Sequence, residues 1–277
     1  MINFSFTMPG RAWNEDRVYS CDDFAFVLDG ATCLTKEHYS DFGSDAEWYS
    51  DWWCEYLKAQ LGNIKKTIPD ILKDGIKKVV KDYKKLSNNA TPEDFPSATL
   101  SLIRRVKGMI EIYSLCDTSI IFLAKSGDTL FVQDASNVVK DGLNVIKIRA
   151  CAKQEGLSLI PARQKFGDIV KQGREIKNKP CGYYVLSDSV EAIDHGIYNT
   201  IDENLIDKVM LLSDGYSQVF DVVKFMSYDK LIKKVNTLKD VEKIYKKLYK
   251  YQESDKNGDK YPRFKVRDDA SVAFMKF

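Results

Sequence analysis

The chain of 277 residues is 44% hydrophobic and 30% charged, a composition typical of a soluble globular protein. Its 42 basic and 40 acidic residues leave a formal charge of +2, which argues against a dedicated nucleic-acid-binding protein. Six scattered cysteines without a Cys-x-x-Cys pair indicate neither a zinc site nor a disulfide framework. No secretion signal opens the chain and no apolar run is long enough to span a membrane. We therefore expect a reduced, cytoplasmic protein that binds neither nucleic acid nor membrane.

Predicted strands and helices follow one another in groups. Short apolar or alternating runs predict strands, and apolar residues spaced by three and four predict helices. In chain order we expect strands at 2–7, 17–20 and 24–28, helices at 44–62 and 67–86, strands at 98–106, 109–115, 119–124 and 129–133, a partly helical segment at about 150–179, strands at 183–186 and 208–213, a helical region from 219 to about 255, and a last strand at 270–277. Segments 30–43 and 87–96 are expected to be irregular. Two groups of strands, each followed by two helices, indicate an α+β fold of paired sheets flanked by helices. No repeat or linker divides the chain, so we expect one domain over residues 1–277.

The apolar run from Phe24 to Leu28 predicts a strand buried on both faces, and it ends in Asp29, followed by glycine. The preceding strand can pair with it as a hairpin. If residues 22 and 23 form the hairpin loop, Asp16 lies opposite Asp29, with Glu15 beside them. Three carboxylates at one end of a hairpin repel one another unless a cation neutralises them. Oxygen ligands of this kind suit magnesium, manganese or calcium. Solvated strand ends are the plainer alternative for a single Asp-Gly pair.

Further acids can converge on the same place. A second buried strand ends in Asp214-Gly215, and the last strand begins after Asp268. A last strand antiparallel to the other two brings its beginning beside their ends. Glycine after an aspartate lets the backbone carbonyl approach a cation without a Cβ in the way. Two divalent ions about 3.5–4 Å apart can share a water and lower its pKa towards neutrality. Arg11 is placed to bind a phosphate through its guanidinium fork.

The motifs around these acids resemble, in the same order, those of the metal-dependent serine/threonine protein phosphatases of type 2C. The similar segments are Arg11-Ala12-Trp13-Asn14-Glu15-Asp16 (Arg-x-x-x-Glu-Asp), Phe26-Val27-Leu28-Asp29-Gly30 (the metal-bridging strand), Ser97-Ala98-Thr99 (a small-residue strand), Leu115-Cys116-Asp117-Thr118 (the Gly-Asp-Ser turn), Leu211-Leu212-Ser213-Asp214-Gly215 (Ser-Asp-Gly) and Arg267-Asp268-Asp269-Ala270-Ser271 (the terminal Lys-Asp-Asn). Each motif alone is weak, but six in order are specific, and they span nearly the full length.

The resemblance implies an αββα sandwich with two Mn²⁺ or Mg²⁺ ions held at one end between two mostly antiparallel sheets. It assigns each site residue a role. Asp29 would bridge both ions, Gly30 would bind one through its carbonyl, Asp214 and Asp268 would hold the second, Glu15 and Asp16 would act directly or through water, and Arg11 would hold the phosphate. The segment near 150–180 corresponds to the family's variable flap, a substrate-selecting element.

Three positions depart from the family pattern. Ala31-Thr32-Cys33 replaces His-Gly-Gly, so a histidine thought to act as general acid is missing. Gln218 stands where the family has an acid, which weakens a third metal site that Asp117 and Asp214 would support. Asp269 replaces the terminal asparagine and adds a negative charge near the ions.

The leading functional hypothesis is a monomeric phosphatase that acts on phosphoserine or phosphothreonine in proteins. Two alternatives stay open: a regulatory phospho-binding module without catalysis, and a phosphatase for a small phosphorylated metabolite. Residues 255–259 superficially resemble a calcium loop, but the sixth and twelfth positions do not fit, so a solvated turn is expected. The two histidines, His38 and His195, are too isolated to support a catalytic triad or a zinc site. His195 as a general acid is the remaining alternative for that role.

Overall fold

The computed structural model describes residues 1–31, 38–87 and 94–277. Residues 32–37 of the expected irregular segment 30–43 lie outside the described residues, as do residues 88–93 of the segment 87–96. Thr32 and Cys33, which belong to the departure from the family's His-Gly-Gly, are therefore not described.

Two five-stranded antiparallel sheets form the centre of the molecule. The first has the strand order β1 (Ile2–Met8), β10 (Ala270–Lys276), β9 (Ile206–Leu212), β6 (Ser119–Ala124) and β7 (Thr129–Gln133). The second has the order β2 (Asp16–Ser20), β3 (Phe24–Ala31), β4 (Ser97–Val106), β5 (Met109–Leu115) and β8 (Ile197–Asp202). The expected α+β sandwich is therefore confirmed.

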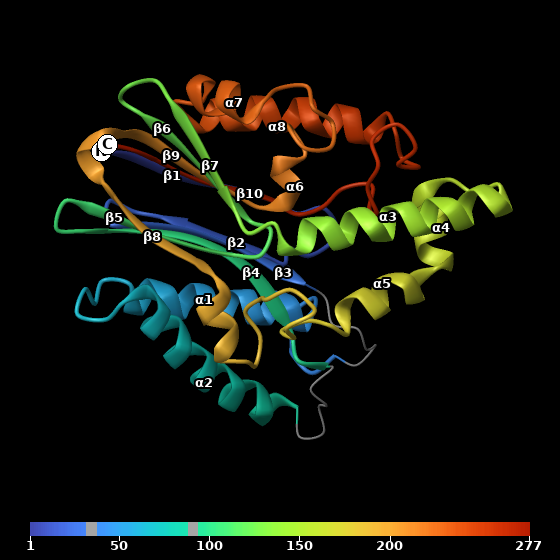
Figure 1. Cartoon of the computed structure of the whole chain (residues 1–277), viewed down its shortest axis with the longest axis horizontal. Helices are drawn as coiled ribbons and strands as arrows, with labels where there is room; N and C mark the ends of the chain where they lie inside the picture. The colour runs from blue at the N-terminus through green and yellow to red at the C-terminus, as the bar shows by residue number, and fades with distance from the viewer. Residues whose placement is uncertain (32–37, 88–93) are drawn as a thin grey trace.

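Helices cover the outer face of each sheet (Figure 1). Helices α1 (Asp45–Gln60) and α2 (Ile68–Leu86) lie on the second sheet, and α7 (Tyr228–Lys234) and α8 (Leu238–Glu253) lie on the first. The remaining helices are α3 (Ser136–Glu155), α4 (Leu159–Lys165), α5 (Gly167–Arg174), the one-turn α6 (Asp214–Ser217), and the 3₁₀ segments η2 (Glu191–His195) and η3 (Glu203–Leu205). In the described parts of the chain, no helix combines the length and apolarity needed to cross a bilayer.

Alternation along β3 explains why its apolar run is unbroken. Phe24, Phe26 and Leu28 pack in the layer under α1 and α2, whereas Ala25 and Val27 pack in the layer between the sheets. Both faces of the strand are therefore buried. Because side chains alternate along a strand, the next residue on the inter-sheet side after Val27 is Asp29. The pattern that fills the core thus also directs this carboxylate between the two sheets.

Helix starts are fixed by side-chain caps. At α2 the Thr67 hydroxyl accepts a hydrogen bond from the Asp70 amide at 3.2 Å and donates to the Asp70 carboxylate at 2.6 Å. Ser44 caps α1 by accepting from the Glu47 amide. These caps satisfy amides that the helix itself leaves without partners.

Several predicted elements were wrong in position or type. β8 was not predicted, because five of its six residues are exposed and an edge strand of this kind carries little apolar pattern. Residues 183–186 form no strand and contribute only isolated bridges to Ala98 and Lys177. The helical region expected from 219 begins only with α7. Lys224, with a φ of 57°, has a left-handed backbone that interrupts an α-helix before that point.

The partly helical segment begins earlier than predicted and forms a lobe, residues 136–174, that projects from the sandwich (Figure 1). A small apolar core from α3 and α4 holds the lobe together. The first turn of α4 is tied to the loop after α8: the Ile160 amide donates to the Asn257 carbonyl at 3.0 Å, and the Leu159 amide donates to Asp259 Oδ1 at 3.2 Å.

The loop after α8 is organised by a buried ion pair, so the expectation of a solvated turn was wrong for its first residue. Asp255 accepts hydrogen bonds from three backbone amides and pairs with Arg263 at 2.9 Å. The Arg263 side chain is 4% exposed and also donates to the carbonyls of Gln252 and Val266. Every Asp255 oxygen is thereby occupied, which leaves none for a calcium ion.

We expect Asp255→Ala to lower the free energy of unfolding by about 3–5 kcal/mol, because it leaves a buried guanidinium and several amides without partners. Urea denaturation followed by far-UV circular dichroism measures this change. Asn257→Ala, which removes an exposed side chain of the same loop and keeps the backbone carbonyl bonded to Ile160, serves as the control and should cost about 1 kcal/mol or less. Equal effects of the two substitutions would contradict the structural role of the buried pair.

Candidate active site

The hairpin of β2 and β3 has the predicted register. Asp16 pairs with Asp29, and the Gly30 amide donates to the Glu15 carbonyl at 3.1 Å. A Cβ on Gly30 would lie 2.6 Å from Ser50 Oγ and 2.7 Å from the Glu15 carbonyl oxygen, so this position requires glycine. The close packing around Gly30 fixes where the neighbouring aspartate stands.

The other sheet brings its acids to the same end of the sandwich. β9 and β10 are antiparallel, and the Ser213 amide donates to the Ser271 carbonyl at 3.1 Å, so the residues before β10 lie beside those after β9. A Cβ on Gly215 would lie 1.9 Å from the Asp269 carbonyl oxygen. Glycine after Asp214 therefore allows the start of the last strand to approach the backbone at position 215. It also leaves that backbone uncovered by a side chain, as expected from the sequence.

Five aspartates form what we call the aspartate cluster: Asp16, Asp29, Asp117, Asp214 and Asp268. Desolvation raises the pKa of Asp29 well above its ordinary value, and the charges of the other four raise this pKa further. Desolvation also raises the pKa of Asp214, with Asp268 and Asp117 adding to the shift. The cluster unites carboxylates from both sheets, as the sequence predicted.

Asp16 is the most deeply buried member of the cluster, at 1% exposure. Neither of its carboxylate oxygens has a hydrogen-bond partner, and the nearby hydroxyls of Ser271 and Ser213 only moderate its pKa. Burial and the charge of Asp269 raise that pKa to about 7. A buried carboxylate without partners is costly, so its oxygens call for a positively charged ligand.

Asp269 has a structural task that explains its departure from asparagine. One carboxylate oxygen accepts from the Gly10 amide at 2.7 Å, and the other accepts from the Glu15 amide at 2.7 Å. An asparagine side chain offers one acceptor oxygen and could satisfy only one of these amides. Asp269 therefore braces the loop that carries Arg11 and Glu15.

Arg11 and Glu15 are paired at the edge of the cluster. The guanidinium lies 2.5 Å from Glu15 Oε2 and 4.6 Å above the Trp13 ring, while Glu15 Oε1 accepts from the Ser44 hydroxyl. With both oxygens engaged, Glu15 is better suited to act through water than to contact an ion directly. Arg11 is partly exposed at the edge of the cluster.

Asp117 and Gln218 face different surroundings. Asn137 of α3 donates to Asp117 Oδ2 at 2.9 Å, so the helical lobe contacts the cluster at its first turn. Desolvation raises the pKa of Asp117. Gln218 is buried and accepts from Gln252 of α8 at 3.1 Å. The Gln218 side chain therefore binds α8 and not the aspartate cluster.

The structure adds Lys265, which the sequence reasoning missed. Its Nζ lies 2.7 Å from Asp268 Oδ1. Desolvation alone would lower the pKa of Lys265, but the charges of Asp268, Asp214 and Asp29 raise it overall. In the described part of the chain, no three His, Cys, Asp or Glu side chains form a ready-made ligand cage. Asp268 is only three residues away, but no local pattern could have shown that Asp214 and Asp29, which come from other strands, also act on this lysine. His195 stacks on Tyr184, with 3.5 Å between the ring centroids.

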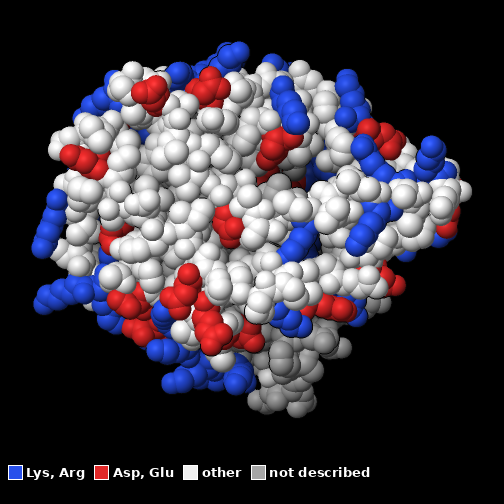
Figure 2. All heavy atoms as spheres, viewed as in Figure 1, with Lys and Arg blue, Asp and Glu red and all other residues white. Residues whose placement is uncertain are grey.

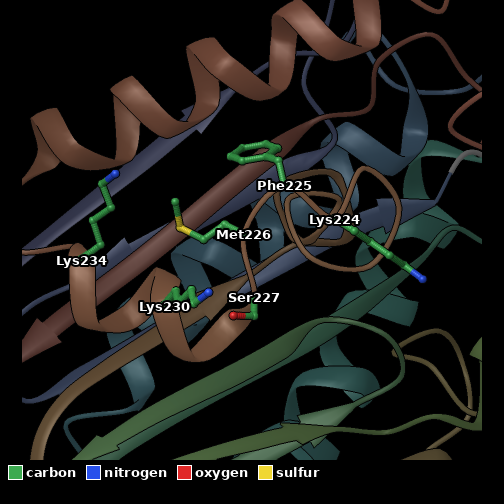
Figure 3. A pocket seen from close by; sticks show the side chains of 6 residues that line it. All are labelled: Lys224, Phe225, Met226, Ser227, Lys230 and Lys234. Atoms are coloured by element: carbon green, nitrogen blue, oxygen red, sulfur yellow. The ribbon is translucent and has the colours of Figure 1, made fainter.

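Acidic and basic side chains border a hollow between the sandwich and the helical lobe in Figure 2. A separate hollow of about 430 Å³ is lined by α7 and the preceding loop (Figure 3). It contains three lysines and no carboxylate, and the Lys224 amine points away from it. The chemistry of the aspartate cluster is therefore unrelated to this second hollow.

A sandwich with an acid cluster between its sheets defines a class of fold, and sequence comparison identifies the family. The model of the family Protein phosphatase 2C matches residues 12–253, so the chain belongs to this family. No curated protein matches the chain in sequence.

Solved structures of bacterial phosphatases share the fold. Serine/threonine phosphatase Stp1 from Staphylococcus aureus has a TM-score of 0.57 and 12% identity, covering 99% of this chain and 94% of its own. The serine/threonine phosphatase PstP/Ppp from Mycobacterium tuberculosis has a TM-score of 0.55 and 14% identity, covering 100% and 98%. The phosphatase MsPP from Mycobacterium smegmatis, solved with cacodylate, has a TM-score of 0.56 and 12% identity, covering 100% and 98%.

The raised pKa of Asp16 predicts how stability depends on pH in a chelating buffer. The folded state holds this proton to about pH 7, whereas the unfolded chain releases it near 3.8, so the wild type should lose stability as pH rises between these values. Each pKa unit corresponds to about 1.4 kcal/mol. As the pH rises from 4 to 7, the free energy of unfolding of Asp16→Asn should therefore increase by a few kcal/mol relative to that of the wild type. Urea denaturation in EDTA measures this difference.

Asp23→Asn, at the turn of the same hairpin, is the control and should give a profile parallel to wild type. A constant difference between Asp16→Asn and wild type across the pH range would contradict the electrostatic strain assigned to Asp16.

Proposed function

We propose that this protein is a cytoplasmic, monomeric phosphatase that depends on Mn²⁺ or Mg²⁺ and hydrolyses phosphoserine and phosphothreonine in proteins. The observation that carries the proposal is the aspartate cluster, in which buried like charges meet and the Asp16 oxygens lack partners. The family membership and the serine/threonine phosphatase names of the structural neighbours support the same activity.

The donor set fits hard divalent cations. It consists of carboxylate oxygens without cysteine or histidine, which favours Mn²⁺ or Mg²⁺ over zinc. Asp29 would bridge two ions, with Asp16 and the Gly30 carbonyl on one side and Asp214 and Asp268 on the other. Glu15 would act through water. Asp117 and Asp214 would hold at most a weak third ion, because Gln218 is engaged with α8.

The residues of the chain have distinct tasks in hydrolysis. Bound divalent cations supply Lewis acidity and lower the pKa of water towards neutrality. Arg11 binds two phosphate oxygens through its guanidinium fork, while Glu15 and Trp13 hold that side chain in place. Asp269 keeps the Arg11 loop in position against the cluster. The lobe at 136–174 would help to select the substrate polypeptide, and its contact with the cluster through Asn137 supports this role.

Turnover should require added Mn²⁺ or Mg²⁺ and disappear in excess EDTA. Phosphopeptides, para-nitrophenyl phosphate and small phosphorylated metabolites are compared as substrates. Asp29→Asn should lower turnover by at least about 10³-fold, because a bridging carboxylate supports both ions. Asp188→Asn, an acid outside the cluster, is the control and should keep full activity.

Full activity in EDTA, or stimulation by zinc alone, would contradict the proposed centre. Equal residual rates for wild type and Asp29→Asn would favour a phospho-binding module. A preference for metabolites over phosphopeptides would favour the small-molecule phosphatase.

Arg11→Ala should weaken inhibition by inorganic phosphate at least about tenfold while Mn²⁺ affinity changes little, because the fork contacts the anion and not the cation. Arg11→Lys keeps the charge but loses the fork, so it should recover only part of the phosphate affinity. Inhibition kinetics and calorimetry measure the two quantities. Loss of Mn²⁺ affinity with unchanged phosphate inhibition would show that Arg11 has been assigned wrongly.

A further inference from the structure

Lys265 is unusual among the paired lysines of this protein. Lys58 and Lys85 form ion pairs with acids three residues away on the same helix. Lys265 also pairs with an acid three residues away, but it lies in the loop between α8 and β10, and its partner Asp268 is a member of the aspartate cluster. Its charge also acts on Asp214 and Asp29, which belong to other strands. The ammonium group is therefore a counter-charge of the cluster as a whole.

The loop backbone is anchored on both sides of this lysine. Arg263 donates to the carbonyl of Val266 at 3.0 Å, and it is itself held by Asp255. Asp269 binds the amides of Gly10 and Glu15. The Lys265 side chain is 52% exposed. It can therefore swing into solvent by rotation about its own bonds while Asp268 stays in place.

Lys265 Nζ lies on Asp268 Oδ1, so a divalent cation that binds this oxygen meets the ammonium there and is repelled by its positive charge. A tethered group has a high effective concentration at its partner, so it competes without being added to the solution. The Lys265 ammonium is also favourable in the metal-free protein, because its one positive charge offsets part of the repulsion among the aspartates. Displacing the Lys265 ammonium costs free energy, so the cation binds more weakly than it would to the carboxylates alone.

We propose that Lys265 is a built-in competitor for divalent cations: it offsets part of the negative charge of the aspartate cluster in the metal-free protein and gives up its contact with Asp268 Oδ1 when Mn²⁺ or Mg²⁺ binds there. This inference rests on the proposed metal centre. It predicts that the protein needs a higher free concentration of Mn²⁺ or Mg²⁺ for activity than it would need without the Lys265 charge.

The test is titration of the EDTA-stripped full-length chain with Mn²⁺ in a calorimeter at fixed pH, comparing wild type with Lys265→Met. The substitution keeps the length of the side chain and removes its charge. We expect Mn²⁺ to bind at least about fivefold more tightly to the variant. In EDTA the variant should also melt at a lower temperature than wild type, and Mn²⁺ should raise its melting temperature by more.

Lys260→Met is the matched control, since Lys260 is exposed in the same loop and lies over the Tyr261 ring. It should bind Mn²⁺ as wild type does. If Lys265→Met binds Mn²⁺ with unchanged or weaker affinity while wild type binds it, the competition is overturned and the metal centre stands. If none of the proteins binds Mn²⁺, the metal centre is overturned, and the competition with it.

Discussion

Repulsion between carboxylates held between two sheets is the constraint on which the rest of this structure depends. Asp16 and Asp29 come from one sheet, and Asp214 and Asp268 come from the end of the other. In a medium of low dielectric constant these charges destabilise one another strongly. The molecule tolerates them because the surrounding scaffold is rigid: the backbone packs closely at Gly30 and Gly215, where any side chain would collide with it.

The same constraint accounts for the groups around the cluster. Both Asp269 oxygens accept hydrogen bonds from backbone amides. The aspartate that stands in place of the family's asparagine therefore fixes a loop. Lys265 supplies positive charge from the solvent side. Small hydroxyl residues, Ser213 and Ser271, line the inter-sheet layer beside Asp16, where bulkier side chains would separate the sheets.

Much of the site could be predicted because it depends on local rules. The loop length of one hairpin fixes the register that places Asp16 opposite Asp29, and Asp29-Gly30 lies close to the end of β3, at Ala31. The fold followed from the grouping of strands and helices. Edge strand β8 could not be predicted, because its exposed residues carry no apolar pattern.

The contacts that the sequence did not predict are those between charged side chains that tertiary packing buries or brings together. Arg263 and Asp255 look like surface residues in the sequence, yet both are buried. Lys265 is one of many lysines, and only the packing of β10 beside β9 gives it Asp214 as a neighbour. A sequence shows which charges exist, whereas the tertiary fold decides which of them meet.

The pairing of β1 with β10 has a consequence for the time at which the site comes into existence. Thr7 and Ser271 share a hydrogen bond of 2.8 Å although 264 positions separate them. At about 5–20 residues per second, the ribosome needs on the order of tens of seconds to travel between these positions. Throughout that interval β1 waits without its partner, and Asp268 and Asp269 have not yet been made. A growing polypeptide therefore carries an incomplete aspartate cluster until its last strand emerges, and premature termination yields fragments that lack Asp268.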